Sequence, residues 1–150
     1  MAFKNILDNL DNHSSYILQY SIALIYLWFG TLKIIDMSPA EELISHTLFF
    51  MPTSTALLII GTFEIIIGLL LLHQKTLRYG LGLLLIHLPG ILSPVVLASE
   101  VIFNQAPYAP ALEGHYVLKN LVLVGAALKL VAEELERNPE LDEYWKNLMP

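Results

Sequence analysis

The chain contains no cysteine among its 150 residues, and charged residues make up only 15% of it. The missing cysteine excludes disulfide bonds, thiol redox chemistry and iron–sulfur clusters held by this chain alone. Basic residues are scarce as well, and the formal net charge is −6. Binding to nucleic acid is therefore not expected, because it requires clustered Lys and Arg to neutralise phosphates. No nucleophile–base motif, phosphate-binding loop or dinucleotide fingerprint occurs either.

Apolar residues are abundant instead. They make up 55% of the chain and give a mean hydropathy of +0.59, whereas about a quarter of the residues in an average soluble domain are charged. Four stretches, residues 16–35, 55–72, 77–98 and 115–132, approach the length of about 20 apolar residues that a transmembrane helix needs. The sequence therefore predicts an all-α bundle of four transmembrane helices (16–132), between an N-terminal interfacial segment (1–15) and an acidic cytoplasmic tail (133–150). Residues 1–15 lack the pattern of a cleaved signal peptide, so we expect the first span to remain as an anchor.

Loop charges predict the orientation. The connection that contains Lys75 and Arg78 is short and basic, whereas residues 36–54 and 99–114 contain acidic residues and no Lys or Arg. Because Lys and Arg concentrate in cytoplasmic loops, both termini and the middle loop are expected in the cytoplasm. The membrane would be the inner (plasma) membrane of the cell.

The two connections expected on the outer side carry signals of their own. Ser38-Pro39-Ala40-Glu41 is typical of a capping box with proline at the first helical position, which predicts a surface helix up to about Phe50. Residues 105–110 contain two prolines and are not expected to form regular structure. We expect this second connection to cover the outer end of the bundle.

Each of the four predicted spans carries an ionisable residue that we expect to matter for function, namely Lys33, Glu64, His87 and Lys119 in turn. A charge at the bilayer centre costs roughly 3 kcal/mol on insertion scales, so such a residue usually faces the bundle interior beside a partner. At a helical rise of about 1.5 Å per residue, Glu64 and His87 fall near midplane and the two lysines toward the outer end. We therefore expect one polar pocket that opens outward. His115 and Glu113, close to Lys119, are further candidate ligand-binding residues.

Helical spacing supports the inward placement of these groups. Gly30 and Lys33 share one face of the first span, and Gly61, Glu64 and Gly68 share one face of the second. Small residues mark places where transmembrane helices approach closely, so Glu64 should point into the bundle. In the third span, Pro89-Gly90 predicts a kink close to His87. If the helix continues through both Pro89 and Pro94, the carbonyls of Leu85 and Gly90 lose their usual donors and need other hydrogen-bond partners.

Simpler interpretations stay open for each group. Glu64 could form a structural ion pair with Lys33 or Lys119 that fixes helix registry, and His87 could be a hydrogen-bonded core histidine. The lysines could extend outward to the membrane interface. The aromatic residues Trp28, Tyr20, Tyr26, Tyr108 and Tyr116 are expected mostly to pack or to lie at the membrane interface. A metal site is not expected, because no tight ligand spacing such as His-x-x-x-His occurs inside a span.

Three motifs together resemble those of the DoxX family of small membrane proteins. The run Leu27-Trp28-Phe29-Gly30-Thr31-Leu32-Lys33 resembles that family's first-helix signature, and His115-Tyr116-Val117-Leu118-Lys119-Asn120-Leu121 resembles the start of its last helix. Gly61-Thr62-Phe63-Glu64 fits the second helix, and the likeness covers roughly residues 16–132. It implies a four-helix membrane fold with Lys33, Glu64 and Lys119 at the family's polar positions. Some members are named as subunits of quinone-linked oxidoreductases, notably of thiosulfate oxidation, and others resemble assembly or stress-response proteins.

The expected function is accordingly that of a DoxX-like membrane protein. Its outward-facing pocket would bind a quinone or a lipid-like ligand, or would serve a partner oxidoreductase as its membrane subunit. Lys33 or Lys119 would hydrogen-bond a quinone carbonyl, while Glu64 and His87 would pass protons. Two alternatives are a non-enzymatic assembly or scaffold protein with structural charges, and a small transporter, although no internal repeat supports the latter. A homodimer is a further expectation, because four short spans leave several faces exposed.

Overall fold

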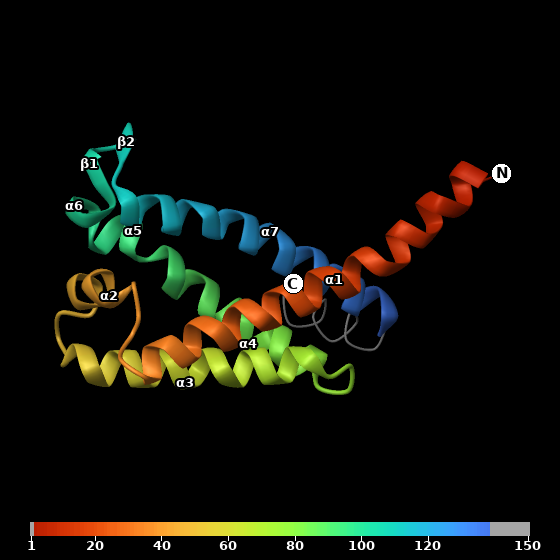
Figure 1. The fold of residues 1–150 in the computed structure, drawn as a ribbon, viewed down its shortest axis with the longest axis horizontal. Helices are drawn as coiled ribbons and strands as arrows, with labels where there is room; N and C mark the ends of the chain where they lie inside the picture. Colours follow the sequence, from red (N-terminus) through yellow and green to blue (C-terminus); the bar gives the residue numbers. More distant parts are fainter. Residues whose placement is uncertain (1, 139–150) are drawn as a thin grey trace, which may run out of the picture.

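The computed structural model describes residues 2–138, with side chains from His13 onward, and consists mainly of helices (Figure 1). The long helices are α1 (Ala2–Ile34), α3 (Thr53–Leu72), α4 (Leu77–Leu92) and α7 (Leu112–Arg137). The short elements are α2 (Glu41–Thr47), α5 (Pro94–Leu97), α6 (Ser99–Ile102), β1 (Phe103–Gln105) and β2 (Ala109–Pro110). Four segments are long and apolar enough to cross a membrane, namely His13–Ile34, Thr53–Leu72, Leu77–Leu97 and Leu112–Arg137. The predicted bundle of four long apolar helices is confirmed to this extent.

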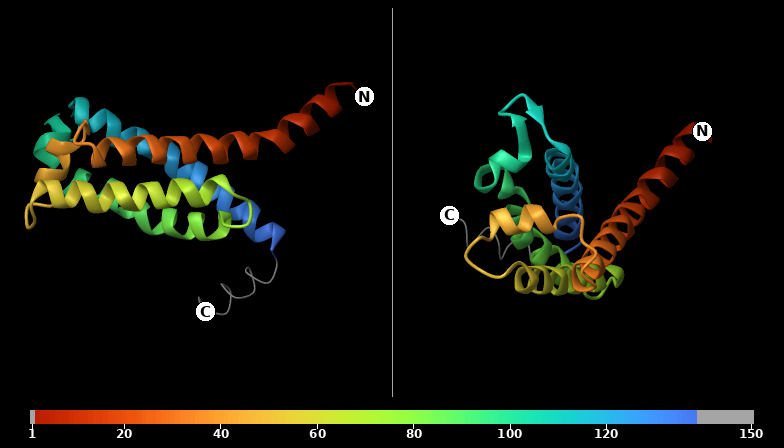
Figure 2. Two further views of the ribbon diagram at one scale, coloured as in Figure 1. Left: turned by 60° about the horizontal axis from the view of Figure 1, so that its bottom comes forward. Right: turned by 60° about the vertical axis from the view of Figure 1, so that its left-hand side comes forward.

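The long helices pack in the order α1, α3, α4 and α7, each against the next. All the short elements gather at one end of the bundle, called the cap end here, whereas α1 begins and α7 finishes at the other, the terminal end (Figures 1 and 2). The main core joins all four helices, for example through Ile22, Ile67, Leu84 and Leu130. Many large apolar side chains point outward instead, and Ile86 and Val122 are more than 70% exposed. An apolar outer surface of this kind suits a protein surrounded by lipid.

The tightest contact in the bundle is between α1 and α3. A Cβ atom added to Gly30 would lie 2.8 Å from the Gly61 carbonyl oxygen, and one added to Gly61 would lie 2.8 Å from the Gly30 carbonyl oxygen. A Cβ on Gly68 would meet the side chain of Leu27 at 2.7 Å. The predicted close approach at these glycines is therefore confirmed. It sets Lys33 and Glu64, which follow them on the same two faces, against one another.

The cap end departs from the sequence prediction in two places. The first surface helix runs from Glu41 to Thr47, with Ala40 and not Ser38 at its N-cap position. Ser38 Oγ instead accepts a hydrogen bond from the nearby Ala40 N–H at 3.2 Å. Pro39 therefore precedes the helix, and the capping-box prediction is wrong. The segment predicted to be irregular also contains regular structure, because β1 and β2 pair as antiparallel strands around it.

The third span is interrupted at Ser93, six residues beyond His87. α4 continues through Pro89 to Leu92, and α5 begins at Pro94. Proline 94 offers no N–H to the Gly90 carbonyl, and Ser93 Oγ donates to that carbonyl at 2.7 Å instead. The Gly90 carbonyl therefore has two new donors, both from Ser93: its hydroxyl group and its backbone N–H, the latter at 3.3 Å.

The two terminal helices are longer than their predicted spans. α1 runs without a break from Ala2, through the segment expected to be separate and interfacial, and α7 ends at Arg137. The two helices meet at the terminal end, where Ser15 Oγ donates to Glu133 Oε1 at 2.8 Å. They then separate toward the cap end, as the views of Figures 1 and 2 agree. The greater part of the predicted acidic tail lies outside the described residues.

Candidate functional site

Glu64 lies at the centre of a polar cluster inside the bundle. Its Oε2 atom is 2.6 Å from Lys33 Nζ, and its Oε1 atom is 3.5 Å from His87 Nε2. The three side chains come from α3, α1 and α4, and each is about nine-tenths covered. The structure therefore brings together three of the four ionisable residues that the sequence placed in one cluster.

Tyr26 is the fourth member of the cluster. It lies on α1, four and seven residues before Gly30 and Lys33, and therefore on the face that packs against α3. Its ring meets the His87 ring edge-on, with centroids 5.7 Å apart. The half-buried ring of Phe63 lies on the histidine as well, at 5.5 Å. We call Tyr26, Lys33, Glu64 and His87 the polar cluster from here on.

Two atoms of the polar cluster are buried without a hydrogen bond among the described residues, namely Tyr26 Oη and His87 Nε2. The 3.5 Å separation of His87 Nε2 from Glu64 Oε1 is too long for a good hydrogen bond. Leaving a buried polar group unsatisfied costs about 1–3 kcal/mol, so such groups are rare in native structures. The Tyr26 hydroxyl and the His87 ring nitrogen, both close to the Glu64 carboxylate, are therefore available to hydrogen-bond a polar atom of a ligand.

Lys119, in contrast, does not join the polar cluster. It is exposed on α7, and its Nζ lies 5.7 Å from the centre of the Tyr116 ring. His115 is exposed one turn before it, with Nδ1 2.8 Å from the Ala111 carbonyl oxygen, and Glu113 is half-buried in the first turn of α7. The predicted site is therefore divided into the polar cluster and a separate group on α7. The division arises because α7 separates from α1 toward the cap end. For Lys119, the sequence prediction rested on its depth along the helix alone.

The polar cluster has the chemistry of proton exchange and hydrogen bonding. It combines an ammonium group, a carboxylate, an imidazole and a phenol, held by three different helices. Within the described part of the chain, no three His, Asp or Glu side chains gather as metal ligands would. A ligand with a carbonyl or hydroxyl oxygen would find both a donor and an acceptor at Tyr26 and His87.

Sequence reasoning missed two buried polar residues. Tyr26 was assigned to packing, although its spacing from Gly30 and Lys33 was a signal for the inner face. Gln19, which is 2% exposed, donates from Nε2 to the Leu71 carbonyl at 2.6 Å and accepts from Gln74 Nε2 at 3.0 Å. Gln19 precedes Tyr26 by seven residues, so the same helical periodicity would have found it.

Comparisons with protein-family models, with curated proteins and with solved structures find no match to this chain.

Proposed function

We propose that this chain is an integral membrane protein of DoxX type whose polar cluster binds the polar ring of a quinone or a similarly amphipathic ligand. It would lie in the inner membrane with both termini in the cytoplasm and the cap end outside. In this role it would serve a partner oxidoreductase as a membrane subunit. The partner would supply any electrons, because the chain has no cysteine and its sequence carries no redox-cofactor motif.

The observation that carries this proposal is the pair of unsatisfied buried atoms, Tyr26 Oη and His87 Nε2. A cluster that served only to hold helices together would be expected to satisfy its own hydrogen bonds. A bound carbonyl oxygen would accept a hydrogen bond from the Tyr26 hydroxyl. His87 would take or release a proton, and the Glu64 carboxylate beside it would balance the charge of the protonated imidazole.

The ligand would enter from the membrane. The side chains of the cluster are about nine-tenths covered, so the ring of a ligand can reach them only if a covering side chain moves. Phe63 is the half-buried aromatic on the His87 ring, and rotation of its side chain would open the histidine face.

Equilibrium binding of a short-chain benzoquinone to the purified protein tests the proposal. Glu64→Gln should weaken binding about tenfold, because it removes the carboxylate that balances the charge of protonated His87 when the ligand is bound. Glu133→Gln is the matched control, since it neutralises a carboxylate at the terminal end. Equal affinities for wild type and Glu64→Gln, with both proteins monodisperse, would contradict the proposal.

A second function is favoured by a different observation. Lys33 and Glu64 are 2.6 Å apart, one turn beyond the close approach of Gly30 and Gly61. An ion pair at this place would fix α1 against α3 and could serve packing alone. The protein would then be a non-enzymatic assembly or scaffold protein. The exchanged pair Lys33→Glu/Glu64→Lys distinguishes the two roles. If the pair is purely structural, the exchanged variant should recover the stability of wild type, and neither protein should bind quinone. If the cluster is a binding site, the exchanged variant should lose the quinone that wild type binds, even where its stability is recovered.

A further inference from the structure

One face of α7 is covered at the terminal end and exposed at the cap end, where the helix buries Gly114 and Val117 on a different face. Leu123, Ala127 and Leu130 lie on one face of α7 and pack into the main core. The same face continues toward the cap end at Lys119 and Tyr116, which are four and seven residues before Leu123. Tyr116 is 55% exposed and Lys119 is exposed as well. These two side chains therefore point where core residues would be expected.

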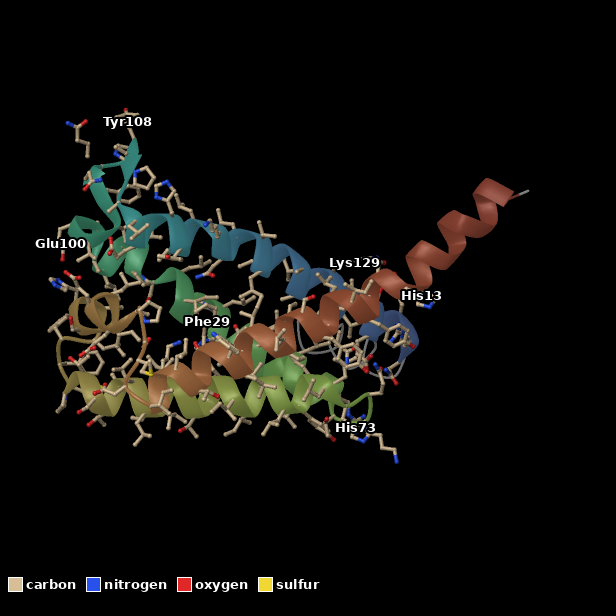
Figure 3. The ribbon with its side chains drawn as sticks, viewed as in Figure 1. His13, Phe29, His73, Glu100, Tyr108 and Lys129 are labelled. Carbon is tan, nitrogen blue, oxygen red and sulfur yellow. The ribbon has the colours of Figure 1, made fainter. Side chains whose placement is uncertain are left out.

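α1 shows the same change along its length. Leu18 and Ile22 pack into the main core, and Ser15 on this side bonds to Glu133 of α7. Ile25 and Phe29 continue that face toward the cap end, and they are 44% and 42% exposed. Figure 3 shows Phe29 on the edge of α1 toward α4 and α7. We call Ile25, Phe29, Tyr116 and Lys119 the open seam, because the two helices that carry them have separated here.

The open seam contains a cation without a matching anion. Among the residues that the structure describes, no carboxylate forms an ion pair with Lys119, whose ammonium is placed only by the Tyr116 ring. A lysine inside a membrane span normally has a partner or reaches the interface. His115 lies one turn nearer the cap end and adds a second group that becomes cationic on protonation.

The depth of Lys119 suits a phosphate at the membrane surface. α7 has 26 residues, about 39 Å of helix, against a hydrocarbon core of about 30 Å. Lys119 is seven residues from the start of α7, or about 10 Å along the axis. In a centred helix its Cα atom therefore lies about 6 Å below the hydrocarbon boundary, a distance that the lysine stem can cover.

We propose that the open seam binds one anionic phospholipid, with its phosphate at Lys119 and an acyl chain along Phe29 and Ile25. A second copy of the chain suits the seam less well. In a parallel dimer about α7 it would bring Lys119 beside Lys119, while the exposed carboxylates Asp36 and Glu100 lie outside the candidate spans. The proposal does not depend on quinone binding, because it concerns residues outside the polar cluster.

Native mass spectrometry of the purified full-length protein with added lipid tests this proposal. Wild type should retain one phosphatidylglycerol molecule in preference to phosphatidylcholine. Lys119→Gln should reduce that retention about fivefold, the effect of one lysine near a membrane surface. Lys129→Gln, on the same helix at the terminal end, should leave it unchanged. Inorganic phosphate in excess should not displace the lipid, because the acyl chain contributes to binding.

A second pair of variants tests the place of binding. Phe29→Ala should weaken phosphatidylglycerol retention, whereas Leu58→Ala, at a similarly exposed apolar position on α3, should not. Equal retention of the two lipids, or equal effects of Lys119→Gln and Lys129→Gln, would overturn the proposal. A lipid-free dimer that Phe29→Ala dissociates would overturn it too, and would assign the seam to a second copy.

Discussion

Lys33 Nζ lies 2.6 Å from Glu64 Oε2, and both side chains are more than nine-tenths covered where α1 meets α3. The contact joins the last turn of α1 to the middle of α3. The two residues are thirty-one positions apart in the chain. In an apolar surrounding, each of these charges is tolerable only because of the other.

The first prediction concerns this pair. Lys33→Met should lower the free energy of unfolding by about 3–5 kcal/mol, because it leaves Glu64 as an uncompensated buried charge. The double variant Lys33→Met/Glu64→Leu should recover most of that loss, since it buries no charge. Equilibrium unfolding in mixed micelles measures both. Equal losses in the single and double variants would show that the two charges are not coupled.

A second prediction concerns the glycines between α1 and α3. Gly61→Ala should destabilise the protein by about 1–3 kcal/mol, because overpacking forces neighbouring groups apart and its Cβ would lie 2.8 Å from a backbone carbonyl oxygen. Gly82→Ala is the control, since nothing lies within 4 Å of a Cβ there. That substitution should be neutral or stabilising by up to about 1 kcal/mol through helix propensity. The same unfolding measurement compares them, and a Gly61→Ala protein as stable as Gly82→Ala would argue against close packing.

A third prediction concerns Gln19 at the terminal end. Gln19→Leu should cost about 1–3 kcal/mol, because the Leu71 carbonyl loses the side-chain donor that reaches it from α1. Gln74→Leu should cost less, since Gln74 is exposed and water can replace its contact with Gln19. Thermal unfolding of the two variants measures the difference. A larger loss of stability for Gln74→Leu than for Gln19→Leu would show that these hydrogen bonds depend on the loop between α3 and α4 and not on α1.

The absence of cysteine permits a direct test of orientation. Single cysteines at Asp36 or Glu100, near the cap end, should react with a membrane-impermeant thiol reagent added to intact cells. A cysteine at Lys75, in the loop between α3 and α4, should react only after the membrane is opened. Labelling of Lys75→Cys alone in intact cells would reverse the proposed topology.

Much of the fold could be predicted because its signals are local. Long apolar runs gave the four spans, and glycine spacing placed Glu64 on the inner face of α3 before any contact was known. Ser38 shows the limit of such signals, because its hydroxyl could cap a helix or bond to its own turn, and only packing decides between them. Prolines at 107 and 110 suggested irregular structure, yet β1 and β2 pair on either side of the turn.

The composition of the polar cluster was harder to predict, because it depends on how the helices cross. Lys119 has the depth expected of a cluster member, but α7 has separated from α1 at that level. Tyr26 has the right helical phase, but an aromatic residue in an apolar helix gives no compositional sign that its hydroxyl is buried beside a carboxylate. The position of Lys119 follows from how the helices cross, which one sequence does not encode as a periodic pattern.

Tyr26→Phe provides the most direct test of the proposed binding role of the polar cluster. The variant removes one buried hydroxyl that has no described partner, so in the absence of ligand it should stabilise the protein by about 1 kcal/mol. The same variant should weaken benzoquinone binding, because the ligand carbonyl loses its phenolic donor. Stability and affinity measured on one preparation should therefore change in opposite directions. A Tyr26→Phe protein that is less stable than wild type and binds benzoquinone equally well would contradict a ligand site at this cluster.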